Sequence, residues 1–145
     1  MTTAVLAALQ TALAAEHSAC YGYGVVGAHL PVGSAALSAA GADWFAHQRA
    51  RDQLTAMISD RGGQPATSAV AYALPFPVTS AITAAQLAAR MEDGVAQAYL
   101  ALVALPEPDL RLLGAQQLRM AALRAESWRG STEAFPGLPP ASLRR

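Results

Sequence analysis

The chain has 145 residues and a formal net charge of zero, which suits one domain and offers no basic excess for binding nucleic acid. Apolar residues make up 53%, but charged residues interrupt every apolar run before it reaches the ~20 residues of a membrane span. A single cysteine excludes an internal disulfide, and no basic segment precedes the first apolar stretch, so we expect a cytoplasmic protein without a signal peptide.

Apolar residues at steps of three and four predict amphipathic helices over about residues 3–29, 34–61, 79–105 and 110–128. Proline and glycine mark the turns between these segments. Thr83 and Gln86 have the spacing of a capping box, with Thr79 and Ser80 as alternative starts of the third helix. Asp109 is a candidate N-cap of the fourth. The sequence therefore predicts an all-α chain, with one helical bundle over residues 1–130 and an irregular, Pro-rich tail over 131–145.

The lengths of the connections predict how these helices are arranged. A few residues join the first helix to the second and the third to the fourth, so each pair is expected to form an antiparallel hairpin. The connection between the second and third helices has about 16 residues and spans up to ~50 Å when extended. A helix of ~27 residues is only ~40 Å long. The connection can therefore cross the whole bundle, which predicts two antiparallel hairpins joined by a long crossover, the topology of ferritin-like four-helix bundles.

The stretch YGYGVVG, residues 21–27, matches the G-x-G-x-x-G pattern of dinucleotide-binding loops. That pattern binds a pyrophosphate only between a strand and the N-terminus of a helix. Here the glycines lie inside a predicted helix, and no predicted strand precedes them. We therefore reject nucleotide binding and interpret Cys20, Gly24 and Ala28, with Gly27 beside them, as a line of small residues that lets a neighbouring helix approach.

Polar residues fall on the expected core face of each predicted helix, where charge is normally absent. In the second helix the apolar heptad pattern passes through Trp44, His47 and Arg51. In the fourth helix the expected core stripe is Leu112, Gln116, Arg119 or Met120, Leu123 and Glu126. Counted from the turns at 1.5 Å per residue, the polar residues reach similar heights in the bundle. They predict one buried polar cluster of Glu16, His47, Arg51, Glu92, Glu126 and Arg129.

This pattern is close to a diiron site, which uses one Glu from each of two helices and Glu-x-x-His from each of the other two. Glu16 and Glu92 fit the single-Glu positions. Trp44 stands where His47 would need a Glu partner, and Arg129 stands where Glu126 would need a His. One interpretation is a metal-free Glu–Arg–His network. The alternative is an iron or manganese site whose ligands are Glu16, His47, Glu92 and Glu126.

Other residue types point to no reaction. No Ser or Cys has a convincing base partner, so the sequence identifies no catalytic residue and we lean against an enzyme. Aromatic side chains near the cluster either pack in the core or line a pocket for an unidentified small molecule, and the candidates are Tyr23, Trp44, Tyr99 and Trp128. Helices so poor in charge leave apolar surface, which predicts a homodimer.

Five segments of the chain resemble an actinobacterial ferritin-like family of unknown function: AEHSACYGYGVVGAHL, AHQRARDQL, AYALPFPVTS, RMEDGVAQAY, and ESWRG with AFPGL. The resemblance covers about residues 5–139 and keeps the order of the segments. It implies a ferritin-like four-helix bundle and no particular activity. Broader ferritin-like relatives bind two irons, which implies the same four candidate ligands, while Trp44 and Arg129 depart from that pattern. We therefore expect a non-catalytic bundle with a polar network in place of a diiron site and no cofactor, with an iron- or manganese-handling redox protein as the alternative.

Overall fold

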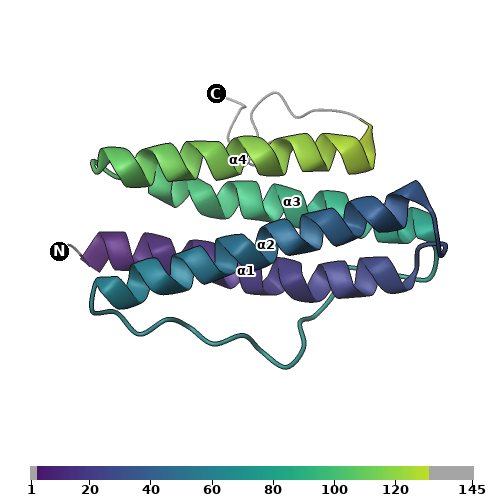
Figure 1. Cartoon of the computed structure of the whole chain (residues 1–145), viewed down its shortest axis with the longest axis horizontal. Coiled ribbons are helices and arrows are strands. Elements are labelled where there is room, and N and C mark those ends of the chain that lie inside the picture. The colour runs from purple at the N-terminus through teal and green to yellow at the C-terminus, as the bar shows by residue number, and fades with distance from the viewer. Residues whose placement is uncertain (1–2, 131–145) are drawn as a thin grey trace.

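The computed structural model describes residues 3–130, and the tail predicted over 131–145 lies outside that part. Within it the chain forms the helices α1 (Thr3–Ala28), α2 (Ala35–Asp60), α3 (Ala81–Val103) and α4 (Pro108–Arg129). α1 and α2 run in opposite directions, as do α3 and α4 (Figure 1). The connector, residues 61–80, passes along the bundle so that α2 and α3 run in parallel. The predicted all-α fold of two hairpins and a long crossover is confirmed.

Local sequence explains where the helices begin and end. The Ser34 side chain caps α2 by accepting a hydrogen bond from the backbone N–H of Leu37. The capping box of α3 pairs Ser80 with Thr83, so the predicted pair of Thr83 and Gln86 is wrong by one turn. α4 begins at Pro108 rather than after Asp109, because proline fits the first helical position, where no N–H is needed.

The glycines of YGYGVVG all lie inside α1, where no pyrophosphate could meet free backbone amides. Close packing occurs at Gly22, where an added Cβ would lie 1.8 Å from Met91 Sδ on α3. Gly24 is exposed and has nothing within 4 Å of such a Cβ. The interpretation as a packing motif therefore holds, but the line of contact runs through Gly22 and not through Cys20, Gly24 and Ala28.

Two apolar clusters fill the bundle, one towards each end. One cluster contains Leu9 and Leu13 of α1 with Leu54 of α2. The other contains Val26 of α1 and Leu87 of α3. The polar layer described below lies between them in sequence along α2 and α3, so apolar packing isolates it from water at both ends.

The core face of α4 differs from the predicted stripe. The buried residues are Leu110, Gly114, Ala121 and Ala125, whereas Leu112, Met120 and Leu123 are exposed. At Gly114 an added Cβ would lie 2.9 Å from the backbone nitrogen of Val103, so the backbones of α3 and α4 approach closely. Small residues face the core here because only they permit that approach. No described helix is long and apolar enough to cross a membrane.

Candidate functional site: a buried Glu–His–Glu network

Three charged or polar side chains meet at the centre of the bundle, from three different helices. Glu16 of α1, His47 of α2 and Glu92 of α3 are 0%, 1% and 0% exposed. His47 Nδ1 lies 2.6 Å from Glu16 Oε2, and its Nε2 lies 2.8 Å from Glu92 Oε1. A carboxylate can only accept hydrogen bonds, so both ring nitrogens donate and the imidazole is a cation held between two anions.

Two tyrosines and an arginine complete this layer. Tyr99 donates from its hydroxyl to Glu16 Oε1 at 2.6 Å, and Tyr23 donates to Glu92 Oε1 at 2.6 Å. Arg124 of α4 donates through Nε to the same Glu92 oxygen at 3.0 Å. The Tyr23 ring also stacks on His47, with centroids 5.3 Å apart. All four helices therefore contribute to one hydrogen-bonded unit in which two cations balance two carboxylates.

The network reaches the edge of the bundle through Asp43 of α2. Trp128 of α4 donates its indole N–H to Asp43 Oδ2 at 2.9 Å, and the Tyr23 hydroxyl lies 3.2 Å from the same oxygen. Burial raises the pKa of Asp43, against the hydrogen bond from Trp128, which favours the charged form. This part-buried carboxylate thus links α2 to the C-terminal end of α4.

The carboxylates keep His47 charged. Burial alone would lower its pKa, but hydrogen bonds to Glu16 and Glu92 and their negative charges outweigh burial and raise the pKa to about 9. Burial also opposes the charge of Glu92, yet the contacts with His47 and Arg124 hold the pKa of this carboxyl below its usual value. The imidazolium and the Glu92 carboxylate are therefore the stable forms at neutral pH.

The neighbouring donors also keep their protons. Burial and the adjacent Glu92 charge raise the pKa of Tyr23, and burial and the Glu16 charge raise the pKa of Tyr99. Burial alone would lower the pKa of Arg124, but the negative charge of Glu92 and its hydrogen bond to the guanidinium outweigh burial and raise this pKa. Each tyrosine hydroxyl and the guanidinium is thus fixed as a hydrogen-bond donor.

Three of the six residues predicted for the polar cluster lie outside the buried network. Arg51 pairs at 2.8 Å with its neighbour Asp52, and its side chain is 32% exposed. Arg129 pairs with Asp93 at the surface of α3. Glu126 is half-buried on α4, and within residues 3–130 no side-chain hydrogen bond joins it to the network. Glu126 lies outside the network because of the rotation of α4 about its axis. This helix buries Ala121 and Ala125, and that orientation directs Arg124 towards the network instead of Glu126.

The predicted aromatic residues also separate into two groups. Tyr23, Tyr99 and Trp128 all donate hydrogen bonds to carboxylates of the network or its edge. Trp44 is 37% exposed and packs against Phe45, outside the core. Trp44 therefore does not replace a buried metal ligand at the position that the heptad pattern indicated.

The arrangement does not fit a metal ion. A His ligand needs a ring nitrogen with a free lone pair, and both nitrogens of His47 are directed at carboxylates. Glu16 accepts hydrogen bonds on both oxygens, and Glu92 Oε1 accepts three. Of the carboxylate oxygens of Glu16 and Glu92, only Glu92 Oε2 has no hydrogen-bond partner among the described residues, and one oxygen is too few for a metal site. No group of three or more His, Cys, Asp or Glu side chains in residues 3–130 has metal-binding geometry.

Sequence reasoning missed Arg124 and Asp43. The spacing of Gly114, Ala121 and Ala125 at seven and four residues was the available signal, because small residues at heptad spacing mark a closely packed face. That face places Arg124 beside the core. Nothing in the local sequence distinguishes Asp43 from a surface residue.

The fold and site define a class: a four-helix bundle with a buried Glu–His–Glu network at its centre. Residues 8–140 match a family model described as a domain of unknown function, DUF4439, and the chain belongs to this family. The chain is also similar to the crystal structure of a conserved hypothetical protein, Rv2844, from Mycobacterium tuberculosis. The two share 37% identity with a TM-score of 0.84, over 90% of this chain and 98% of the other. No curated protein matches the chain.

Proposed function

We propose that this protein is a non-catalytic, ferritin-like bundle in which a metal-free network replaces a diiron site. One observation carries the proposal: His47 lies between two carboxylates and donates to both. In this position the imidazolium supplies positive charge that a metal ion would otherwise supply between Glu16 and Glu92. The crossover topology and the mid-helix position of these residues support the relation to ferritin-like proteins.

The closed environment of the network supports a structural role rather than catalysis. Glu16, His47 and Glu92 are almost fully buried, so a substrate has no direct access to them. The surface pockets between α1, α2, α3 and the connector are lined by other residues. The network links all four helices through fixed donor–acceptor pairs, and buried polar groups of this kind select one register of the helices over its alternatives. We infer that the network holds the bundle in a single arrangement.

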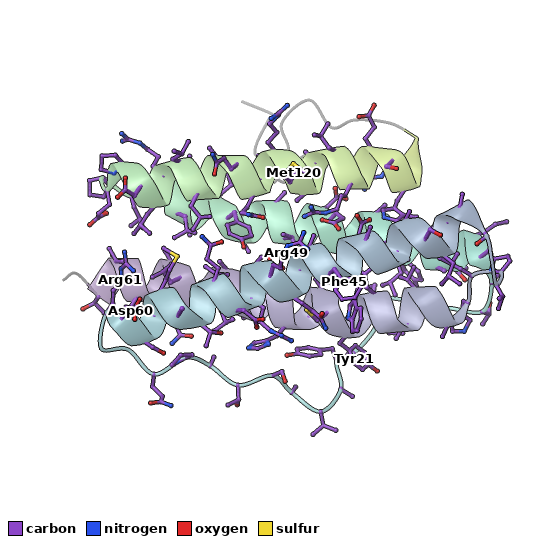
Figure 2. All side chains as sticks on the ribbon, viewed as in Figure 1. Tyr21, Phe45, Arg49, Asp60, Arg61 and Met120 are labelled. Carbon is purple, nitrogen blue, oxygen red and sulfur yellow. The ribbon has the colours of Figure 1, made fainter. Side chains whose placement is uncertain are left out.

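Self-association and cytoplasmic residence belong to the same proposal. Three large apolar side chains of α4 are exposed: Leu112 (59%), Met120 (45%) and Leu123 (45%). They lie within one 12-residue stretch of α4, the helix on which Figure 2 labels Met120. An exposed apolar face supports a homodimer. Light scattering should give a dimer mass that Leu123→Glu reduces to that of a monomer, and a wild-type monomer at high concentration would contradict the dimer.

A single half-buried cysteine is compatible with a reducing compartment, which supports cytoplasmic residence.

The proposal is tested by metal content. Untagged protein is expressed in medium supplemented with iron and manganese, loaded anaerobically with Fe(II), desalted and measured by elemental mass spectrometry. We expect far less than one metal ion per chain, and the same value for Glu92→Ala. Near-stoichiometric iron or manganese that Glu92→Ala removes would overturn the proposal and favour the alternative, an iron- or manganese-binding redox protein.

A further inference from the structure

A second site is formed on the outer side of α1 and α2, beneath the connector. The pocket has a volume of about 620 Å³, within the usual range for small-molecule sites. Figure 1 shows the connector bowing away from the helices on this side. Tyr21, labelled in Figure 2, lies on the side of α1 that the connector passes. The residues that give the pocket its chemistry are Tyr21, Trp44, Gln48, Arg51, Asp52 and Tyr72. None of them belongs to the buried network.

The connector wall of this pocket is held in place. Gln10 of α1 donates to the carbonyl of Gln64 at 2.6 Å and accepts from the N–H of Ala66 at 3.0 Å. His17, also on α1, donates through Nε2 to the Ala66 carbonyl at 2.9 Å. Beyond the pocket, Leu74 and Phe76 pack against the second apolar cluster, as does Val78. Because the connector is fixed on both sides of the pocket, the cavity is preformed and a ligand would not need to order it.

One face of α2 presents three complementary groups to the pocket. Trp44, Gln48, Arg51 and Thr55 follow one another at steps of four, three and four, so they lie on the same side of the helix. Trp44 supplies an aromatic ring, Gln48 an amide and Arg51 a guanidinium. Tyr21 of α1 and Tyr72 of the connector also line the pocket and form a tilted pair with ring centroids 5.6 Å apart. Three aromatic rings in the lining of one pocket suit a flat, aromatic ligand.

The positive charge in the pocket is available for a ligand. Both Nε and Nη2 of Arg51 bond to a single oxygen of Asp52, at 2.8 Å each. The Asp52 side chain is 68% exposed, against 32% for Arg51, so Asp52 can exchange this pair for water at little cost. Burial raises the pKa of the nearby Cys20 thiol above its ordinary value of 9.0, so this thiol is neutral at neutral pH and does not repel an anion.

We propose that this pocket binds a small aromatic carboxylate. The ring would lie between Trp44 and the pair of Tyr21 and Tyr72. The carboxylate would replace Asp52 on Arg51, because a guanidinium binds a carboxylate through two parallel hydrogen bonds. The Gln48 amide, one turn from Arg51, would donate to the same group.

The test is calorimetric titration of the whole chain with 2-naphthoate and with its uncharged analogue 2-naphthamide. We expect saturable binding of 2-naphthoate and binding of 2-naphthamide weaker by roughly tenfold or more. Arg51→Gln should weaken 2-naphthoate binding by a similar factor and leave the amide unchanged. Trp44→Ala should weaken both compounds. Asp52→Asn should strengthen 2-naphthoate binding several-fold, because it removes the carboxylate that competes for Arg51.

Arg49 provides the matched control, since it is exposed on α2 on the side away from the connector (Figure 2). Arg49→Gln removes the same charge from the same helix and should leave both affinities unchanged. Equal affinity for the acid and the amide would overturn the proposal, as would an equal loss in Arg49→Gln and Arg51→Gln. Absence of saturable binding below about 1 mM would also overturn it. Thermal unfolding of each variant verifies that it is folded.

Discussion

His47 and Glu16 are 31 residues apart in the chain, and the His47 Nδ1 and Glu16 Oε2 atoms are 2.6 Å apart in the core. The contact joins the two helices of the first hairpin at mid-height. The opposite nitrogen of the same ring contacts Glu92 in the second hairpin. A single imidazole therefore connects the two hairpins, and its removal should affect the whole bundle.

Replacing His47 by Gln should lower the free energy of unfolding by about 3–5 kcal/mol, because two buried carboxylates lose the cation between them. Urea unfolding followed by circular dichroism measures the change. Arg51→Gln is the control: its pair with Asp52 is partly exposed, so the loss should stay below about 1 kcal/mol. This reverses the sequence-based expectation that Arg51 is part of the network. Equal losses in the two variants would contradict the structure of the site.

Stability should fall on the alkaline side of neutrality. The pKa of His47 is about 9 in the folded chain and about 6.5 in the unfolded chain, so the stabilisation is fully present below about pH 6.5. It is lost as pH rises through about 9, and a difference of this size corresponds to roughly 3 kcal/mol. Urea midpoints from about pH 6 to about pH 9.5 avoid the ordinary titration of Glu and Tyr. His47→Gln should retain only the smaller decline that the raised pKa of the Cys20 thiol causes at alkaline pH. A wild-type protein with constant stability across the range would exclude a charged His47.

Tyr99→Phe should lower the free energy of unfolding by about 1–3 kcal/mol, because Glu16 Oε1 loses a buried donor at 2.6 Å. The shape of the side chain is otherwise unchanged, so packing is preserved. Tyr72→Phe is the matched change in the connector, where the hydroxyl accepts a hydrogen bond from the exposed N–H of Ala69. Its effect should remain within about 0.5 kcal/mol. The same urea titration compares the two, and a larger effect at Tyr72 would be evidence against the network.

Gly114→Ala should destabilise the protein by about 1–3 kcal/mol, because the new Cβ would lie 2.9 Å from Val103 N and 3.1 Å from the Tyr99 carbonyl oxygen. Backbone atoms cannot move aside as a flexible side chain can. Gly94→Ala is the opposite case, since a Cβ there meets nothing within 4 Å. It should stabilise the helix by about 0.5–1 kcal/mol. Thermal midpoints of the two variants should therefore shift in opposite directions.

The position of the polar layer could be predicted from the sequence because it depends on local geometry. Each residue of a helix adds the same rise, so distance along the chain from a turn gives height in the bundle. Glu16, His47 and Glu92 were expected at one height and are found in contact. Their hydrogen-bond partners depend on how each helix is rotated about its axis. The predicted rotation of α4 placed Glu126 in the core, whereas in the structure Arg124 faces the network and Glu126 does not.

The sequence by itself determined four helices, two short turns and a crossover long enough to make α2 and α3 parallel, since propensity, proline, glycine and chain length are local properties. Only the tertiary structure decided that α4 packs through Gly114, Ala121 and Ala125, and that Arg124 rather than Arg51 completes the network. The reason is physical: close backbone approach between α3 and α4 requires small residues, and that approach outweighs the burial of the larger Leu112 and Leu123.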